Sequence, residues 1–396
     1  MNTTMLNSLK LCLAAALALG SLSPARADQD IVITQNIQVL GQTKPIPLAI
    51  SGFSGEVLQV LKFDLYVQGF AFTTPDVAQY QITGTPGENV TGTVFDSIAK
   101  QPILARAYSG TTLRRQAHFF ANDIVAAIAH RPGIGLTKIA FKKEIALGHG
   151  EIYVADFDGF NPQFVTHDDT IVAAPCWVPG KLAVCYTSYY PGNPDIFYQS
   201  LTSGQRTIVA KYSGLNTSPA VSPDGSHLAM VLSKGGSPNI WVAEADGTNP
   251  KKLTSTLEDS SPCWSPDGQW ICFATKLRER RVLAKVPAGG GELQVIHTAG
   301  VSNPTEPDWS PDGKWIAFTR QAGEFDICVV PADGSIPPTV LVPGEDPSWS
   351  PNSRTLIFTR RTAGGSYALS VLDVMTKQVK DIKRISGNDS QPAWAR

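Results

Sequence analysis

The fold follows from the stretch PDWSPDGKWIAFTR, residues Pro307–Arg320. Its Ser-Pro-Asp-Gly element is typical of a tight turn. Pro fixes φ at the second position, Asp is tolerated at the third position, and Gly adopts the left-handed conformation at the fourth. The turn joins a strand ending near Trp309 to a second strand at Trp315–Phe318. A Pro-Asp-Gly sequence favours a three-residue loop with a bulge as the connection.

Related stretches recur along the chain, beginning at Pro175, Pro219, Pro262, Pro347 and Pro392. Their third positions, together with that of the quoted stretch, are Trp177, Val221, Trp264, Trp309, Trp349 and Trp394, at spacings of 44, 43, 45, 40 and 45 residues. Each unit also contains two further strand-like runs, as in 239–247 and 251–255. This period and strand content are those of a propeller blade.

The chain ends just after the sixth copy of the repeated cluster, Pro-Ala-Trp, begins, and an incomplete blade upstream explains why. Residues 136–144 and 151–160 have the pattern of a second and a third strand with no first strand before them. The terminal Pro392–Trp394 cluster would supply that first strand. Since unpaired sheet edges favour unwanted association, sharing one blade between both ends closes the ring. The sequence therefore predicts a mainly β protein with a six-bladed β-propeller, consistent with known blade numbers.

The region before the propeller lacks the repeat and has a different sequence pattern. Residues 1–27 have a basic residue, an apolar run and an Ala-Arg-Ala site, which predict a secretory signal peptide. Residues 28–133 are expected to form a small α+β domain, and residues 134–396 the propeller. Helices are predicted around residues 54–69 and 112–132. Strands are predicted at Ile31–Thr34, Ile46–Ile50, Tyr80–Thr83, Val90–Phe95 and Ile103–Tyr108.

The charge balance and the absence of catalytic motifs argue against several classes of function. The chain has 33 basic and 34 acidic side chains, which gives no electrostatic reason to expect nucleic acid. G-x-S-x-G, H-E-x-x-H and C-x-x-C motifs are absent. The predicted inner-strand positions before each third position are mostly inert: Cys176, Ala220, Cys263, Asp308, Ser348 and Ala393. We therefore expect no catalysis; the alternative is a secreted propeller hydrolase or lyase acting on peptide or polysaccharide.

Two pairs of cysteines occupy equivalent places in two repeats. Cys176 and Cys185 are nine residues apart, as are Cys263 and Cys272. A four-residue loop would place each pair opposite on adjacent strands, where a disulfide can form. The three-residue loop would instead set Cys263 opposite Ile271 and leave buried thiols that act as small apolar side chains. Both alternatives stay open at this point.

The loops that lead into each predicted inner strand are often acidic. Because the chain returns there from the outer edge of one blade to the ring axis, these residues should lie at the channel rim. They are Asp168, Asp169, Glu258, Asp259, Glu306, Glu345, Asp346 and Asp389, with Asn216 in the remaining loop. Such a negative mouth would attract a basic partner segment or a divalent cation such as calcium. The alternative is that acids and amides simply populate turns.

The signal peptide, the α+β domain, the join GIGLTKIAF (133–141), the stretch DFDGFNPQFV (156–165) and six blades closed by Pro-Ala-Trp together resemble the TolB family of periplasmic propellers of the Tol-Pal system. The resemblance covers the whole chain after the signal peptide. It implies a monomeric, non-enzymatic adaptor that supports outer-membrane integrity and cell division. The helix that the family places before the middle strands is expected to be shortened here to Thr73–Tyr80.

The resemblance also implies two protein partners. The peptidoglycan-associated lipoprotein would bind at the channel mouth and hold the adaptor peripheral to the outer membrane. Its contact residues would include Leu215, Asn216, Thr217 and Ser218, and Glu258, Asp259, Ser260 and Ser261. The inner-membrane protein TolA would bind the segment after the signal peptide, Asp28, Gln29, Asp30, Ile31, Val32 and Ile33, continuing to about Asn36.

Overall fold

The structure is a computed structural model that describes residues 40–190 and 192–396. The predicted signal peptide, the segment Asp28–Asn36 and the strand at Ile31–Thr34 lie outside the described residues. Within the described part, no helix is both long and apolar enough to cross a membrane.

The first described region is a mixed sheet with two helices. Its elements are β1 (Ile46–Ser51), α1 (Gly55–Tyr66), β2 (Phe70–Phe72), β3 (Tyr80–Pro86), β4 (Val90–Asp96), β5 (Gln101–Tyr108) and α2 (Leu113–Ala129). The strand order is β2-β1-β3-β4-β5. All four predicted strands in the described part of this region are present, while the short β2 was missed. The helix expected at Thr73–Tyr80 is wrong: residues 75–77 form a turn.

Both helices pack one apolar face into a common core. Val57, Leu61 and Leu65 of α1 are buried, as the helical spacing of these side chains requires. Phe120, Ile124 and Ile128 of α2 join them, whereas Leu113 at the start of α2 is 36% exposed. Thr112 caps α2, because its side chain accepts a hydrogen bond from the Arg115 backbone N–H.

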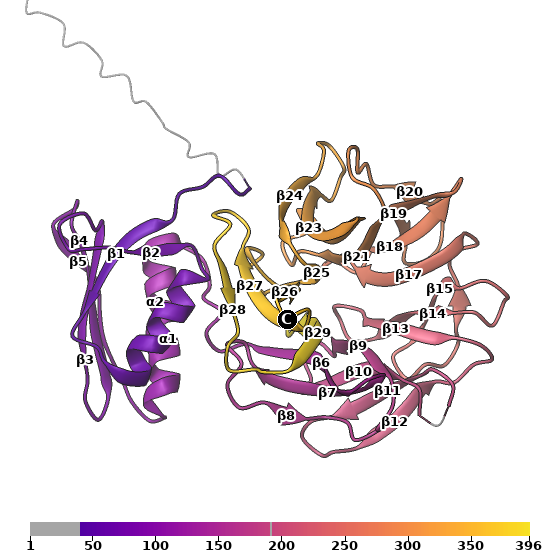
Figure 1. Cartoon of the computed structure of the whole chain (residues 1–396), viewed down its shortest axis with the longest axis horizontal. Coiled ribbons are helices and arrows are strands. Elements are labelled where there is room, and N and C mark those ends of the chain that lie inside the picture. The colour runs from indigo at the N-terminus through magenta and orange to yellow at the C-terminus, as the bar shows by residue number, and fades with distance from the viewer. Residues whose placement is uncertain (1–39, 191) are drawn as a thin grey trace, which may run out of the picture. The chain divides into compact units, whose positions relative to one another are not determined.

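The remaining strands form six four-stranded sheets in the described residues. In chain order the strands are β6 (Lys138–Ala146), β7 (His149–Asp156) and β8 (Gln163–Phe164); β9 (Val172–Trp177), β10 (Ala183–Ser188), β11 (Asp195–Ser200) and β12 (Arg206–Ala210); β13 (Asn216–Val221), β14 (His227–Leu232), β15 (Asn239–Glu244) and β16 (Lys251–Lys252); β17 (Leu257–Trp264), β18 (Trp270–Leu277), β19 (Arg280–Pro287) and β20 (Gln294–Val295); β21 (Pro304–Trp309), β22 (Trp315–Ala322), β23 (Glu324–Pro331) and β24 (Thr339–Pro343); β25 (Glu345–Trp349), β26 (Thr355–Arg361), β27 (Tyr367–Asp373) and β28 (Val379–Asp381); and β29 (Asn388–Trp394). Figure 1 shows these sheets following one another around a common centre. The six-bladed propeller is confirmed.

The first blade combines both ends of the repeat region. Its strand order is β29-β6-β7-β8, so the last strand of the chain lies beside strands from near residue 140. Trp394 pairs with Ile139 and Ala393 with Ala140. In Figure 1 the C-terminus lies beside β29 and β6. The predicted closure of the ring by Pro392–Trp394 is therefore confirmed. The division of the chain at residue 133 stays a prediction.

Three of the repeated tryptophans join neighbouring blades. Trp177 donates its indole N–H to the Ala393 carbonyl, Trp264 to that of Ala220, and Trp349 to that of Asp308, at 3.0, 2.8 and 3.1 Å. Each acceptor lies on the innermost strand of the preceding blade. Buried indoles need such a partner for their N–H, which explains why the large aromatic residue recurs at this position.

The Ser-Pro-Asp-Gly turns are wider than predicted. Ser265 accepts a hydrogen bond from the Trp270 backbone N–H at 2.9 Å and donates to Asp267 at 2.5 Å. The Ser265 backbone N–H also donates to the Trp270 carbonyl. These bonds hold 266–269 as a four-residue loop, so Cys263 pairs with Cys272 and Trp264 with Ile271. The prediction of a three-residue loop is wrong, because the Ser and Asp side chains satisfy the backbone of the longer loop.

Candidate functional site

The innermost strands of all six blades enclose a cavity of about 610 Å³. Its wall is formed by residues around the Pro of each repeat, including Pro175, Pro219, Pro262, Pro307, Pro347 and Pro392. Every blade contributes to this axial cavity, which makes it the first candidate for a binding site.

One residue in every innermost strand has a left-handed backbone. These residues immediately precede the Pro: Ala174, Ser218, Ser261, Glu306, Asp346 and Gln391, with φ between 50° and 55°. Positive φ is uncommon for residues other than glycine and produces a bulge in the strand. The register shifts of β9, β13, β17, β21, β25 and β29 fall at these points. Since all six blades share it, the bulge belongs to the architecture of the cavity wall.

Polar side chains connect several of these bulges around the axis. Glu306 accepts from the Asp346 backbone N–H at 3.2 Å, and Asp346 from that of Gln391 at 3.3 Å. Gln391 in turn accepts from the Ala174 backbone N–H at 2.9 Å. Each side chain thus binds the equivalent backbone group of the next blade. Burial and the neighbouring carboxylates of Glu306 and Glu345 raise the pKa of Asp346.

Two of the predicted rim residues lie inside blades and hold loops in place. The buried Asp259 accepts hydrogen bonds from Thr254, Thr256 and Thr275. Asn216 is also buried, and its amide donates to the carbonyls of Pro194, Tyr212 and Gly214. The polar atoms of both side chains are occupied by these hydrogen bonds and are not available to a ligand in the axial cavity. Neither residue forms part of the cavity wall.

Asp168 and Glu258 are paired with basic side chains. Both carboxylate oxygens of Asp168 accept from Arg206 at 2.6 Å, and the side chain of Asp168 is 3% exposed. Glu258 is half exposed and lies 3.4 Å from Lys276 and 3.6 Å from Arg281. The expected concentration of negative charge is therefore reduced by cations from neighbouring strands. Asp169 is the most exposed of the predicted acids and contacts His149.

The predicted site residues thus divide into groups by position. Thr217, Ser218, Glu306 and Asp346 line the axial cavity. Asp168, Asn216, Asp259 and Asp389 are enclosed within the blades. Leu215, Glu258 and Asp169 are exposed, and Ser260 is half-buried. Glu345 lines a second cavity of about 540 Å³, where burial raises its pKa. Partner binding by any of them stays a prediction.

Asp389 should make the free energy of unfolding depend on pH. It stands at the position equivalent to Asp259, but its nearest cation, Lys143, is 3.8 Å away and its Oδ1 has no hydrogen-bond partner among the described residues. Burial raises the pKa of Asp389 to about 6. Because the folded state favours the protonated form, the free energy of unfolding should fall as the pH rises from about 4 to about 6.

We therefore expect Asp389→Asn to remove this part of the pH dependence. A neutral amide carries no charge-burial cost, so at pH 8 the variant should be more stable than the parent by about 1–3 kcal/mol. Urea unfolding at pH 4, 6 and 8 measures the difference. Asp259→Asn is the matched comparison, and it should lose stability at pH 8 because it breaks satisfied bonds. Parallel pH profiles for the parent and Asp389→Asn would contradict the assignment.

The loops that enter the innermost strands define one face of the propeller. We call residues 165–171, 211–215, 253–256, 296–303, Gly344 and 382–387 the crossing loops. Because neighbouring strands in each blade are antiparallel, the hairpins between second and third strands lie at the same end. This end is the crossing-loop face; the Ser-Pro-Asp-Gly turns lie at the other.

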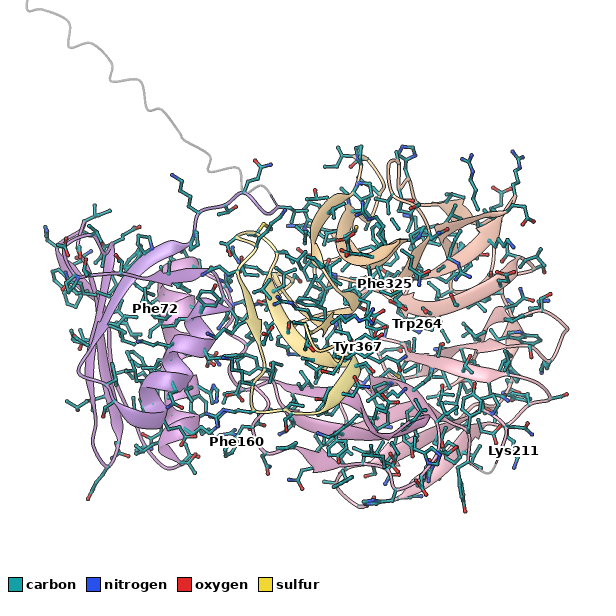
Figure 2. The ribbon with its side chains drawn as sticks, in the orientation of Figure 1. Phe72, Phe160, Lys211, Trp264, Phe325 and Tyr367 are labelled. Carbon is teal, nitrogen blue, oxygen red and sulfur yellow. The ribbon has the colours of Figure 1, made fainter. Side chains whose placement is uncertain are left out.

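Large apolar side chains are exposed on the crossing-loop face. They are Ile145, Leu147, Ile171, Tyr190, Leu215, Leu257 and Phe325, each 37–96% exposed. Phe325 and Tyr367, labelled in Figure 2, come from adjacent blades and line the second cavity. Large apolar side chains exposed together on one face are typical of a protein-binding surface. Of these residues only Leu215 was predicted, because the acidic character of the loops drew attention away from their apolar members.

The axial cavity also contains an ion pair that the sequence did not indicate. Asp308 accepts from the Trp349 backbone N–H at 2.7 Å and pairs with Arg396. Burial raises the pKa of Asp308, against the opposing effect of Arg396. Within residues 40–190 and 192–396, no group of three or more His, Cys, Asp or Glu side chains is arranged to hold a metal ion.

Comparisons with known proteins agree with this fold. Residues 126–396 match the family model described as the TolB beta propeller domain. The chain is 33% identical over 188 residues to the Tol-Pal system protein TolB of Desulfosudis oleivorans, covering 45% of this chain and 42% of that protein. It is 30% identical over 295 residues to the Tol-Pal system protein TolB of Anaeromyxobacter sp. strain K, covering 63% and 66%. The chain thus spans between about two fifths and two thirds of these relatives.

The crystal structure of TolB from Acinetobacter baumannii superposes with a TM-score of 0.80. The alignment covers 90% of this chain and 98% of that one, at 22% identity, and therefore supports the fold. The family match covers well over half of the chain and includes all six blades. This chain belongs to the TolB propeller family.

Proposed function

We propose that the chain is a non-enzymatic component of the Tol-Pal system that binds the peptidoglycan-associated lipoprotein on its crossing-loop face. The large apolar side chains exposed on the crossing-loop face carry this proposal. Apolar anchors at the centre of an interface supply most of the binding free energy, while polar groups at the rim add specificity. The names of the curated relatives support membership of the Tol-Pal system.

The crossing-loop face supplies both kinds of group. Leu215 and Leu257 are 37% and 56% exposed and immediately precede the buried Asn216 and the paired Glu258. The buried amide of Asn216 holds its loop by three hydrogen bonds to backbone carbonyls. A loop held in this way presents its apolar side chain with little loss of conformational entropy on binding. The two leucines are therefore suitable anchors.

The test compares two substitutions on the crossing-loop face with one on the opposite face. Leu215→Asp and Leu257→Asp should each weaken binding to the peptidoglycan-associated lipoprotein at least about 10-fold, because each places a charge in an apolar contact. Leu182→Asp is the matched control, since Leu182 is 46% exposed in the turn between β9 and β10, at the other end of the blade. Isothermal titration calorimetry measures the affinities.

All three variants should unfold at the parent temperature, because the leucines are exposed. Equal affinities for the parent and both crossing-loop variants would contradict the proposed face. Weakening by Leu182→Asp alone would place the partner on the opposite face.

The rest of the proposal concerns location and the second partner. The predicted signal peptide places the chain in the periplasm, as a monomer held at the outer membrane through the lipoprotein. TolA would bind the segment Asp28–Asn36, and together these interactions would support outer-membrane integrity and cell division.

A further inference from the structure

Two blades of the propeller contain cysteines in direct cross-strand register. Cys176 on β9 pairs with Cys185 on β10, and Cys263 on β17 pairs with Cys272 on β18. The same paired positions in the other blades are Ala220 with Ala229, Asp308 with Ala317, Ser348 with Ile357, and Ala393 with Ala140. Cysteine therefore occurs at both members of the pair or at neither. All five cysteines of the described residues are thiols in the structure.

Directly opposed residues are close enough to be cross-linked. Their Cα atoms lie about 4.5–5.5 Å apart in an antiparallel ladder, within the range of about 4.4–6.8 Å seen in disulfides. The two thiols of the first pair also interact: a hydrogen bond with Cys176, followed by burial, raises the pKa of Cys185. Cys328 differs, because its cross-strand neighbours are Phe318 and Val340. It is an internal example of a buried cysteine without a cysteine partner.

One thiol of each pair can be reached from the axial cavity. Cys176 and Cys263 line the cavity, whereas Cys185 and Cys272 are 2% and 0% exposed. Cys176 is the more accessible of the two lining thiols, being half-buried. A small oxidant that enters the cavity can therefore react first at the lining cysteine, with the buried partner opposite it to complete the reaction.

We propose that these two pairs are oxidation sites that form the cross-strand disulfides Cys176–Cys185 and Cys263–Cys272, leaving Cys328 as a thiol. The oxidant is a disulfide compound. The thiolate of the lining cysteine attacks one oxidant sulfur, which forms a mixed disulfide and releases one thiolate. The thiolate of the buried cysteine then attacks the lining Sγ, forms the intramolecular disulfide and releases the second thiolate. Overall the pair loses two protons and two electrons, and the oxidant becomes two thiols.

The cross-links would act on the cavity wall. Each cysteine of the lining strand follows the bulge residue by two positions, which are Ala174 before Cys176 and Ser261 before Cys263. A disulfide would fix these bulges to the second strand of the blade. Directly opposed Cβ atoms are about 4.5–5.5 Å apart, slightly more than a relaxed disulfide requires, so reduction should be easy. The sites therefore form a reversible clamp on two of the six bulges.

The test begins with the full chain, fully reduced and then incubated with oxidised glutathione. The protein is unfolded at acidic pH, its remaining thiols are alkylated with N-ethylmaleimide, and peptides are identified by mass spectrometry. Among the five cysteines that follow the predicted signal peptide, we expect alkylation of Cys328 only, with two disulfide-linked peptide pairs. Alkylation of all five cysteines, glutathione adducts without cross-links, or cross-links to Cys328 would overturn the proposal.

Matched variants separate the two pairs. Cys176→Ala with Cys185→Ala copies the Ala220–Ala229 pair of another blade, so this variant is expected to fold. It should retain only the second disulfide, and the Cys263→Ala with Cys272→Ala variant only the first. Cys328→Ala should retain both. Loss of both cross-links in either double variant would contradict independent sites.

A second readout is the thermal unfolding of the oxidised chain. Its transition should move to lower temperature when dithiothreitol is added, whereas the chain with all four paired cysteines changed to alanine should not respond. An equal response of both proteins would mean that the cross-links do not restrain the folded blades. Oxidation in the cell rests on the export included in the proposed function, but these chemical tests do not, so the two proposals can fail separately.

Discussion

A chain ending at Gly387 is expected to lose the cooperative unfolding of the propeller. The deletion removes β29, which is the innermost strand of the first blade. It also removes the Ala393 carbonyl, which accepts the Trp177 indole N–H, and the Gln391 side chain, which accepts the Ala174 backbone N–H. Loss of a buried tryptophan alone costs about 3–5 kcal/mol, so we expect destabilisation by more than about 5 kcal/mol.

Thermal unfolding followed by near-ultraviolet circular dichroism measures this effect. Trp394→Phe is the control, since it retains the strand and an aromatic ring but loses the 2.8 Å hydrogen bond to Thr137. It should cost only about 1–2 kcal/mol. If the shortened chain unfolds at the temperature of the full chain, closure by β29 does not stabilise the ring.

Trp349→Ala is the single substitution with the largest expected effect. Trp349 is fully buried and is among the largest fully buried side chains of the described residues. It packs with Leu356, Phe358 and Leu372, and its indole N–H donates to the Asp308 carbonyl. The cavity left behind and the unsatisfied carbonyl should together lower the free energy of unfolding by about 4–6 kcal/mol.

Urea unfolding checks this value. Trp270→Ala is the comparison, because Trp270 is only half-buried at the start of β18. It should cost no more than about 2 kcal/mol. Similar losses for both tryptophans would show that the recurring position after Pro-x has no special part in the packing between blades.

The architecture could be predicted from the repeat because its signals are local and periodic. The third position is Trp in five of the six repeats, and in three of them the indole N–H bonds to the preceding blade, so the aromatic residue recurs at the blade period. The terminal Pro392–Trp394 cluster then identified the incomplete blade, and the pairing of Trp394 with Ile139 confirms that reasoning. A strand pairing across more than 250 residues was accessible only because the motif occurs in five other copies.

The details of the turn and bulge were less predictable. The four-residue loop depends on side-chain hydrogen bonds of Ser265 and Asp267, which override the general preference of Pro-Asp-Gly. The left-handed residues before each Pro had no compositional signal, since none of the six is glycine or asparagine. Four of these residues donate their backbone N–H to a side chain of the preceding blade, and such contacts between blades cannot be read from one repeat.

The candidate site shows a similar limit. Acidic residues were correctly placed in or beside the loops that lead to the axis, but their orientation depends on partners elsewhere in the chain. Asp168 turns toward Arg206, which is 38 residues away, and Asp259 turns toward a set of threonines. Glu306 and Asp346 face the cavity, yet they also bind backbone groups of the next blade. Loop position alone could not separate these roles.

The binding face can be tested directly by hydrogen exchange of the full chain with and without the peptidoglycan-associated lipoprotein. The proposed function predicts slower exchange on binding in the crossing loops 211–215, 253–256 and 296–303, which belong to the proposed binding face. The turns containing Pro223, Pro266 and Pro311, at the other end of the blades, should exchange at unchanged rates. Protection of those turns without protection of the crossing loops, or no protection anywhere, would contradict it.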